Sequence, residues 1–395
     1  MRMSLTGWLL RSSALLLWVY ISNGFGLAGG TPQYVLTNDD VPPFFTSGVT
    51  FFTVGAGGAL TLKEQVSTEA SGTGGGFFAT SRLAVLDSAS AQCVYASNAG
   101  AGDIVGIDIS TLQIGGTASG SSTDTGISNG IGLVMNPQYL YASFTDVNTI
   151  GTFQVQPGCS LTFVNDVSVG GLQGGFITSM AINGSTLVAT YGDGSIESFN
   201  ISSGTPVSNG DKQNSTAYLS SQGATYPNGI DITKDGHYVI FGDTSTDSVV
   251  EISDISGGKL SPTVSYTTGH TINSSNVLLS PDETLLYISD SQGDRISAAF
   301  FDASTGTLSG KGCASGRLKN YDTDWTYTAS LGLASTTGTG SVLYVAEFGN
   351  TSSIAMVQVS SSGGKCTLTE MAKSPVTDTY SSWLLSITTF PPRPF

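Results

Sequence analysis

The stretch LLSPDETLLYISDSQGDRISAAFFDASTGTLSG, residues Leu278–Gly310, decides the fold class. An alternating segment over Asn276–Ser280 leads into a Ser-Pro-Asp turn, and apolar strands are predicted over Leu285–Asp290 and Ile296–Asp302. A fourth strand is predicted from Thr307 onward. Short alternating segments separated by Gly, Pro, Asp and Asn are typical of β-strands, and four of them in one repeat are typical of a propeller blade.

The second strand of this stretch, an apolar run that ends in a polar residue, recurs along the chain. Its copies are YVLTND from Tyr34, CVYASNAG from Cys93, YLYASF from Tyr139, TLVATYGD from Thr186, HYVIFGD from His237, LLYISD from Leu285 and VLYVAE from Val342. We take as equivalent the positions Asn38, Asn98, Phe144, Tyr191, Asp243, Asp290 and Glu347, which lie 46 to 60 residues apart. Seven copies at such a period predict seven blades.

The two ends of the repeat array complement each other. The first copy has no inner strand before it, whereas a lone apolar segment, Trp383–Phe390, follows the last copy. We therefore expect an all-β, seven-bladed β-propeller in which the C-terminal strand pairs with the N-terminal blade. Such closure of the ring removes the sheet edges that an open array exposes. A β-helix or a pair of β-sandwiches is the alternative.

Composition excludes several other classes of protein. The chain has 395 residues, 39% of them hydrophobic and only 11% charged, so it has apolar surface to bury and is not expected to be disordered. Its 51 glycines follow no three-residue period, which excludes collagen. With 29 acidic against 14 basic residues, nucleic acid and anionic membrane surfaces are poor partners.

The first 28 residues predict a secretory signal peptide. They contain no acidic residue, two arginines (Arg2 and Arg11) and an apolar run, Ala14–Ile21, that is too short to span a bilayer. Small residues up to Ala28 suit a cleavage site. We expect a secreted protein with a single propeller domain over residues 29–395 and no membrane contact after cleavage. A signal anchor that stays in place is the alternative.

Secretion would place the four cysteines in an oxidising compartment, where disulfides form and persist. No pair among the four has the C-x-x-C spacing of a metal or redox site, so two structural disulfides are expected, with three possible pairings. Pairing of sequence neighbours, Cys93 with Cys159 and Cys313 with Cys366, is favoured. Glycosylation is predicted at the five N-x-S/T sequons, Asn183, Asn200, Asn214, Asn273 and Asn350.

The repeat itself resembles that of a known family. Leu278–Gly310 looks like the repeat of the lactonase-type seven-bladed propellers, the family of 6-phosphogluconolactonase and the fungal carboxymuconate cyclases, and of their secreted fungal branch. SRLAVLDSASAQCVYASNAGAGDIVGIDI (Ser81–Ile109) is similar to the same family. The resemblance implies a site built from His, Arg and Glu, yet this chain has only two histidines, His237 and His270. We therefore expect chemistry that requires no group titrating near neutral pH.

A second resemblance concerns metal binding. YPNGIDITKDGHYVIFGDT (Tyr226–Thr244) is similar to the gluconolactonase and senescence-marker propellers, which implies Asn129, Asn228 and Asp243 as ligands of a divalent cation. Oxygen donors of this kind suit Ca²⁺ or Mg²⁺. The N-terminal Glu ligand of those proteins has no counterpart here, so we expect no metal and no cofactor.

The predicted site lies on one face of the ring. Loops that enter each inner strand and loops that leave each second strand share a face, which we call the top face. Asn129, Asn228, Asp243 and Asp290 are the candidate catalytic residues, and further polar residues expected there are Asp39, Asp40, Asn276, Asp294 and Glu347. Aromatic residues predicted to surround a pocket for a small, mostly apolar organic substrate are Phe45, Phe144, Tyr226, Trp325, Tyr327 and Phe348.

These features together predict a secreted enzyme of non-redox ring chemistry, cyclase- or lactonase-like. The family resemblance also implies a hetero-Diels–Alder type of cycloaddition in fungal natural-product biosynthesis, which needs orientation and hydrogen bonds rather than a strong acid or base. A metal-dependent lactonase and a non-catalytic secreted or cell-surface binding protein are the alternatives. The oligomeric state stays open.

Overall fold

A computed structural model describes residues 34–39, 47–72, 81–120, 130–221, 227–243, 249–267, 274–290, 294–319, 327–336, 340–348, 352–379 and 384–392. Contacts divide the chain into residues 1–30 and 31–395, and every described residue belongs to the second unit. The predicted signal peptide lies outside the described residues. Over the ranges just given, no helix is both long and apolar enough to cross a bilayer.

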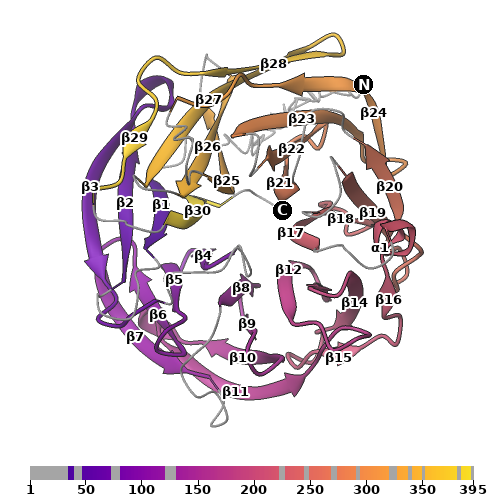
Figure 1. The fold of residues 1–395 in the computed structure, drawn as a ribbon. Coiled ribbons are helices and arrows are strands. Elements are labelled where there is room, and N and C mark those ends of the chain that lie inside the picture. Colours follow the sequence, from indigo (N-terminus) through magenta and orange to yellow (C-terminus); the bar gives the residue numbers. More distant parts are fainter. Residues whose placement is uncertain are drawn as a thin grey trace, which may run out of the picture. The chain divides into compact units, whose positions relative to one another are not determined.

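The second unit consists of seven antiparallel sheets arranged around a centre (Figure 1). From the inner strand outward, blade 1 is β30 (Leu384–Phe390), β1 (Tyr34–Asp39), β2 (Gly48–Val54) and β3 (Leu60–Ser67). Blade 2 is β4 (Leu83–Asp87), β5 (Gln92–Asn98), β6 (Asp103–Asp108) and β7 (Gln113–Ser119). Blade 3 is β8 (Ile131–Met135), β9 (Tyr139–Phe144), β10 (Thr149–Val155) and β11 (Leu161–Ser168). Blade 4 is β12 (Ile177–Asn183), β13 (Thr186–Tyr191), β14 (Ser195–Asn200) and the short strands β15 (Val207–Ser208) and β16 (Gln213–Asn214).

The last three blades follow the same order. Blade 5 is β17 (Pro227–Ile232), β18 (Tyr238–Asp243), β19 (Val249–Asp254) and β20 (Val264–Thr267). Blade 6 is β21 (Ser274–Leu279), β22 (Leu285–Asp290), β23 (Arg295–Asp302) and β24 (Thr307–Ala314). Blade 7 is β25 (Tyr327–Thr336), β26 (Gly340–Phe348), β27 (Ser353–Ser362), β28 (Lys365–Glu370) and β29 (Val376–Thr377). The described helices are short: η1 (Ala56–Gly58), η2 (Pro157–Cys159) and α1 (Thr216–Ser221). The predicted seven-bladed, all-β fold is confirmed.

Ring closure takes place as predicted. β30 pairs antiparallel with β1, with Tyr34 opposite Phe390 and Thr37 opposite Ile387. In Figure 1 the yellow β30 lies beside the indigo β1, so the two ends of the repeat array share one sheet. The predicted segment began at Trp383, which lies outside the described residues, and the strand itself begins at Leu384.

Pairing register corrects one predicted equivalence. Asp39 lies opposite Leu384, the first residue of its inner strand, just as Asp290 lies opposite Ser274. The equivalent position in blade 1 is therefore Asp39 and not Asn38. Because side chains alternate along a strand, Asn38 points the other way, and its Nδ2 donates to the Ser97 carbonyl of blade 2 at 3.4 Å.

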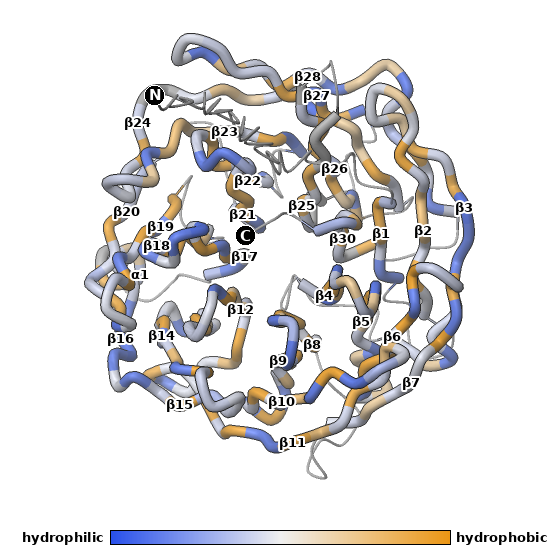
Figure 2. The backbone as a smooth tube through the Cα atoms, turned by 180° about the vertical axis from the view of Figure 1, so that it is seen from behind, coloured by the Kyte–Doolittle hydropathy of each residue, from blue (hydrophilic) through white to orange (hydrophobic). Residues whose placement is uncertain are grey.

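The core lies between the blades rather than within one central mass. Seven clusters of buried apolar side chains occupy the seven interfaces between neighbouring blades. Along β26, Leu343 and Val345 pack against blade 6, whereas Val342 and Tyr344 pack against blade 1. A strand covered on both faces is apolar at successive positions, which explains the run that marks each repeat. Figure 2 shows hydrophobic stretches in every part of the ring.

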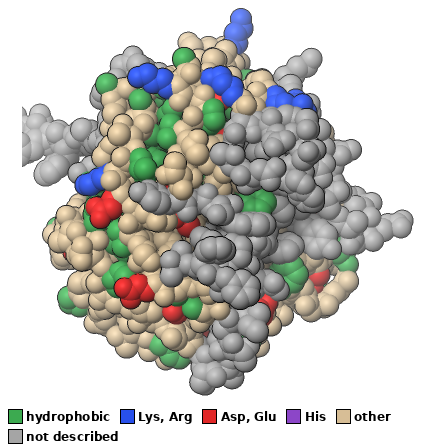
Figure 3. Space-filling model, turned by 60° about the vertical axis from the view of Figure 1, so that its left-hand side comes forward, with side chains coloured by type: hydrophobic (Ala, Val, Ile, Leu, Met, Phe, Trp, Pro, Cys, Tyr) green, Lys and Arg blue, Asp and Glu red, His purple; other side chains and the backbone are tan. Residues whose placement is uncertain are grey.

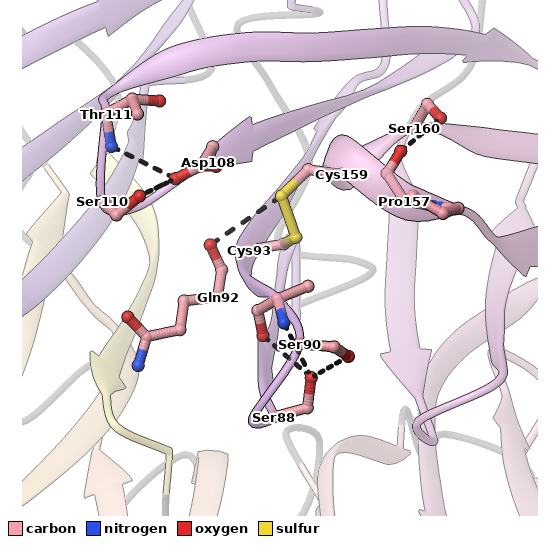
Figure 4. Close-up of a disulfide and its surroundings, with 11 residues drawn as sticks. Ser88, Ser90, Gln92, Cys93, Asp108, Ser110, Thr111, Pro157, Cys159 and Ser160 are labelled. Atoms are coloured by element: carbon pink, nitrogen blue, oxygen red, sulfur yellow. Dashed lines mark hydrogen bonds between the residues drawn. A yellow bond between two sulfur atoms is a disulfide. The ribbon is translucent and has the colours of Figure 1, made fainter.

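Two disulfides connect neighbouring blades, and both follow the favoured pairing. Cys93 at β5 is joined to Cys159 in η2, with 5.6 Å between the Cα atoms, and links blades 2 and 3 (Figure 4). Cys313 of β24 is joined to Cys366 of β28, with 5.7 Å between the Cα atoms, and links blades 6 and 7. The described part of the chain contains no free cysteine.

The low charge of the chain is visible on the surface. On the face shown in Figure 3, the described acidic and basic side chains lie singly or in small groups, separated by uncharged atoms. The described part of this face therefore carries few charged side chains.

Candidate functional site

A cavity of about 250 Å³ lies in the central channel, and the inner strands of all seven blades contribute to its wall. It lies deeper than the predicted pocket on the top face, because most lining residues come from the middle and far half of the inner strands. Pro392, which follows β30, also contributes to the wall.

The two sides of this cavity differ in polarity. Among the residues that the structure describes, blades 3 and 4 contribute only apolar ones, namely Leu133, Val134, Met135, Met180, Ala181 and Ile182. Polar residues come from the remaining blades, namely Asp231, Asn276, Ser330, Ser386, Thr388 and Ser81. A ligand that fills the cavity therefore meets hydrocarbon at blades 3 and 4 and a mixture of hydrogen-bonding groups and hydrocarbon at the other five blades. We call the six polar residues the polar wall.

Asn276 is the only described lining residue with a side-chain amide. It lies in β21 opposite Ser289 and is 8% exposed, and no other described residue forms a hydrogen bond with its side chain. Gly229, with φ of +64°, lets β17 approach closely, because a Cβ there would be 2.4 Å from the Asn276 Cα. The sequence thus fixes the backbone at Asn276 and leaves its amide available to a ligand.

Asp231 is the only charged residue among the described residues that line the cavity, and its side chain supports the backbone. Its Oδ1 accepts a hydrogen bond from the Ile232 N–H at 2.9 Å, and its Oδ2 accepts one from the Leu279 N–H at 2.8 Å. The second bond joins blade 5 to blade 6. A carboxylate whose two oxygens are both engaged by backbone donors is poorly suited to remove a proton from a ligand.

Two further carboxyl groups lie at the top of the interface between blades 6 and 7. Asp294, immediately before β23, is 1% exposed, and no described residue donates a hydrogen bond to either of its carboxyl oxygens. Burial raises the pKa of Asp294 to about 7; the charge of Arg317 opposes this shift and that of Asp290 adds to it.

Glu347, at the top end of β26, is its counterpart from blade 7. It is 1% exposed, and its Oε2 accepts a hydrogen bond from the Ser353 hydroxyl at 2.5 Å. Burial raises the pKa of Glu347 to about 7; the Ser353 hydrogen bond opposes the shift, whereas Glu370 and Asp294 add to it. Neither Asp294 nor Glu347 lines the cavity, so the expectation of chemistry without a group that titrates near neutrality stays a prediction.

The predicted catalytic residues that the structure describes do not line this cavity. Asn129 lies outside the described residues. Asn228 is 2% exposed, and its Oδ1 accepts a hydrogen bond from the Ser179 hydroxyl at 3.4 Å. Asp243 and Asp290 are fully buried at the top ends of β18 and β22, and the Asp290 Oδ2 is 3.9 Å from the Arg295 Nε.

The predicted aromatic pocket is not seen in the described part of the chain, where no aromatic residue lines the cavity. Phe45, Tyr226 and Trp325 lie outside the described residues, and of Tyr327 only the backbone is described. Phe144 is 1% exposed and packs near Phe153, with 6.5 Å between ring centroids, in the core of blades 2 and 3. Phe348 is half-buried at the end of β26.

Two of the three implied metal ligands lie in blade 5. Asn228 pairs with Gly242, the neighbour of Asp243, so these two lie on adjacent strands of blade 5. Within the described ranges, no three His, Cys, Asp or Glu side chains gather in a way that could hold a metal ion.

Three of the five sequons can be placed. Asn200 is exposed at the end of β14, whereas Asn183 is half-buried and its Nδ2 donates to the carbonyls of Thr233 at 2.6 Å and Lys234 at 3.0 Å. Asn214 lies half-buried in β16, and Asn273 and Asn350 lie outside the described residues.

Comparison with known proteins agrees with the seven-bladed fold. Residues 95–377 match the family described as "Lactonase, 7-bladed beta-propeller". Among solved structures, a candidate 6-phosphogluconolactonase from Bacteroides fragilis is 14% identical with a TM-score of 0.65, covering 92% of this chain and 99% of that one. One from Bacteroides uniformis is 13% identical with a TM-score of 0.61, covering 90% and 99%.

A functionally unknown protein from Desulfotomaculum acetoxidans is equally similar, at 13% identity and a TM-score of 0.62, covering 90% of this chain and 98% of that one. Identities this low show a common fold only. No curated protein sequence matches the chain significantly.

Proposed function

Since the chain belongs to the lactonase family of seven-bladed β-propellers, we propose that it catalyses a non-redox ring reaction on a small, mostly apolar molecule bound in the central cavity. The observation that carries this proposal is the uneven cavity wall, which is apolar on blades 3 and 4 and has its six polar residues on the other five blades. Opening or closing of a lactone ring suits such a site, because a lactone has one polar ester edge and a hydrocarbon remainder.

Asn276 is the residue we assign to the reacting oxygen. Its Nδ2 donates a hydrogen bond to the carbonyl oxygen, on which negative charge accumulates when water adds to the carbonyl carbon. The ring C–O bond then breaks, and the proton of the water passes to the released alkoxide to give a hydroxy acid. A donor placed in advance stabilises this charge, and loss of one such donor commonly lowers the rate by about a hundredfold to a thousandfold. The apolar side, with Met135 and Met180, holds the hydrocarbon part in one orientation.

The experiment compares three lactones by proton release at constant pH: δ-valerolactone, dihydrocoumarin and glucono-δ-lactone. We expect turnover of the first two and little of the third, because its hydroxyl groups would be left without partners on the apolar side. Asn276→Ala should lower kcat at least a hundredfold while the protein stays folded. Asn165→Ala on the outer strand β11 is the matched control and should leave kcat unchanged.

Three results would contradict the proposal. Preference for glucono-δ-lactone would show that the polar groups outweigh the apolar side. Full activity of Asn276→Ala would remove the donor from the mechanism. Binding of these lactones without any turnover would indicate the non-catalytic binding protein.

A cycloaddition of the hetero-Diels–Alder type is the second candidate. The observation that favours it is the engagement of both Asp231 oxygens by backbone donors, which leaves the described cavity wall with orientation and hydrogen bonding as its main means of catalysis. It predicts acceleration of the reaction between a diene and an activated carbonyl compound, again lowered by Asn276→Ala. Lactonase activity that disappears on chelation and returns with Ca²⁺ would instead support the metal-dependent alternative.

We also propose that the protein is secreted. Its two disulfides are of the kind that form and persist in oxidising compartments. Expression of the full chain in a eukaryotic host should yield protein in the medium whose N-terminus lies near residue 29. Retention in the membrane fraction with residues 1–28 intact would contradict this.

A further inference from the structure

The residues that follow β30 remain at the central channel. β30 runs from the top of blade 1 to the bottom, because its first residue, Leu384, lies opposite Asp39 at the top end of β1. In blades 2 to 7 the inner strand leads directly into its own second strand, whereas β30 and β1 come from opposite ends of the repeat array. Pro391 and Pro392 are therefore not part of such a turn. Both are half-buried, and Pro392 lines the cavity.

The strand register shows how deep each blade lines the cavity. We count positions down each second strand from its equivalent top-end residue, for example Asp290 in blade 6. Among the described residues, blades 2, 3 and 4 line the cavity down to the partner of the fourth position; these residues are Val85, Met135 and Ile182. Blades 1, 5 and 6 line it down to the partner of the third position; these residues are Thr388, Asp231 and Leu278. Blade 7 stops at Leu331, one position higher.

Pro392 lies at the lower end of this cavity. Phe390 pairs with Tyr34, the fifth position of β1, so β30 ends below every described lining residue of the seven inner strands. Pro392 is two residues further along the chain and within about 7 Å of that strand end. The level at which the walls of blades 7 and 1 stop is therefore within reach of Pro392.

The upper end of the cavity is marked by Asn276, whose partner Ser289 is the first position below Asp290. Ile182 lies at the level of the fourth position. Three steps along a strand separate these levels, which corresponds to about 10 Å. A ring held at the Asn276 amide thus has limited room before its substituent reaches the level of Pro392.

We propose that Pro391 and Pro392 form the floor of the cavity, where they close the bottom of the channel and limit the length of a ligand held at Asn276. Proline suits this task, because its ring fixes φ and its backbone has no N–H that needs a partner. Two successive prolines give a stiff, apolar floor. The ligand class that follows is a lactone ring with no side chain or a short one. The ligand class rests on the proposed function, whereas the floor itself does not.

The first experiment measures access to the channel from below, without any ligand. Val85→Cys places a thiol at the lower end of the cavity wall, and it is the only free thiol because all four native cysteines form disulfides. A charged methanethiosulfonate reagent forms a mixed disulfide with this thiolate and releases methanesulfinate. The reaction should be about tenfold faster when the chain ends at Phe390, because the rate of such exchange depends on access. It should keep the full-length rate when the chain ends at Pro392.

Val164→Cys on the outer strand β11 is the matched control. Val164 is 47% exposed and far from the cavity wall, so its variant should react at one rate in all three chain lengths. β30 is complete at Phe390, so the ring should still close in the shortest chain. Pro392→Gly in the full chain removes the ring of the floor residue without shortening the chain, and it should also speed the reaction of Val85→Cys.

Two results would overturn the floor. If the chain that ends at Pro392 reacts as fast as the one that ends at Phe390, residues 393–395 close the channel and the two prolines do not. If Val85→Cys reacts at one rate in all chain lengths, nothing after β30 closes it. Should the shortest chain lose its cooperative thermal unfolding, Pro392→Gly decides, and an unchanged rate there refutes the floor.

The second experiment compares the Kd values of δ-valerolactone, δ-octalactone and δ-dodecalactone. Each further methylene that becomes buried strengthens binding roughly fourfold. In the full chain we expect a gain from δ-valerolactone to δ-octalactone and none from δ-octalactone to δ-dodecalactone, whose longer chain meets Pro392. In the chain that ends at Phe390, the gain should continue to δ-dodecalactone.

The outcomes separate the floor from the proposed function. A gain that continues to δ-dodecalactone in the full chain refutes the length limit. If none of the three lactones binds to either chain while the thiol reaction still depends on Pro392, the proposed function is refuted and the floor stands.

Discussion

Replacing Cys313 and Cys366 together by Ser tests how strongly blades 6 and 7 depend on their covalent link. The disulfide joins residues 53 positions apart. Closing a loop of that length in the unfolded chain removes entropy worth about 4 kcal/mol at 25 °C, on the chain-entropy account of disulfides. Both sulfurs are only half-buried against the apolar cluster of that interface, so loss of packing adds little.

The assay is urea unfolding under non-reducing conditions, with the Cys93→Ser/Cys159→Ser variant as the matched control. That disulfide spans 66 residues, so the entropic loss is again about 4 kcal/mol. Cys93 and Cys159 are 0% and 1% exposed, however, and the buried hydroxyls of the serines should make the control variant less stable than the test variant.

Because the two loops do not overlap in sequence, the losses should add in the quadruple variant. A loss below about 1 kcal/mol for Cys313→Ser/Cys366→Ser would refute the entropic reasoning. A larger loss for that pair than for the buried pair would refute the reasoning about packing.

Other regions give further predictions. Mass spectrometry of secreted protein should find a glycan on Asn200 and none on Asn183, whose amide nitrogen already donates to two carbonyls; the reverse occupancy would contradict the placement of these side chains. Ile387→Ala in β30, where the side chain is 4% exposed, should cost about 2 to 5 kcal/mol in urea unfolding, and a smaller cost would mean that the ring closes without tight packing there. Gly106→Ala should lower the melting temperature, because its Cβ would lie 1.8 Å from the Cys159 carbonyl oxygen; an unchanged melting temperature would show that η2 moves freely.

Much of the fold could be predicted because each repeat contains the sequence pattern of its own strands. The second strands, such as Leu285–Asp290, are covered on both faces, so they appear as short apolar runs that end at a polar residue on the top face. Ring closure followed from a lone strand at one end and a missing one at the other. The register of Asn38 and Asp39 could not be predicted, because both residue types suit a strand end and only pairing with β30 separates them.

The site was less predictable for two physical reasons. Asn228 and Asn276 begin inner strands in similar ways, yet only Asn276 lines the cavity, and this depends on bulges in β17 and β21 that the sequence does not show. The pKa values of Asp294 and Glu347 depend on burial between blades, whereas residue types alone indicate ordinary acids. The aromatic residues of the pocket were predicted because many aromatic residues occur in the loops of the top face. Phe144 shows that such an aromatic residue can instead be buried in the core.

Closure by β30 has a consequence for biosynthesis. Chains are made from the N-terminus, and the inner strands of blades 2 to 7 are made directly before their own second strands, so these blades can form in turn. Blade 1 must wait, with the edge of β1 unpaired, until the last strand leaves the ribosome. Ser386, Thr388 and Pro392 of the cavity wall arrive only then. A chain that stops before Leu384 therefore lacks both the strand that closes its ring and one wall of its cavity. It also carries an exposed strand edge with which a second nascent chain could pair.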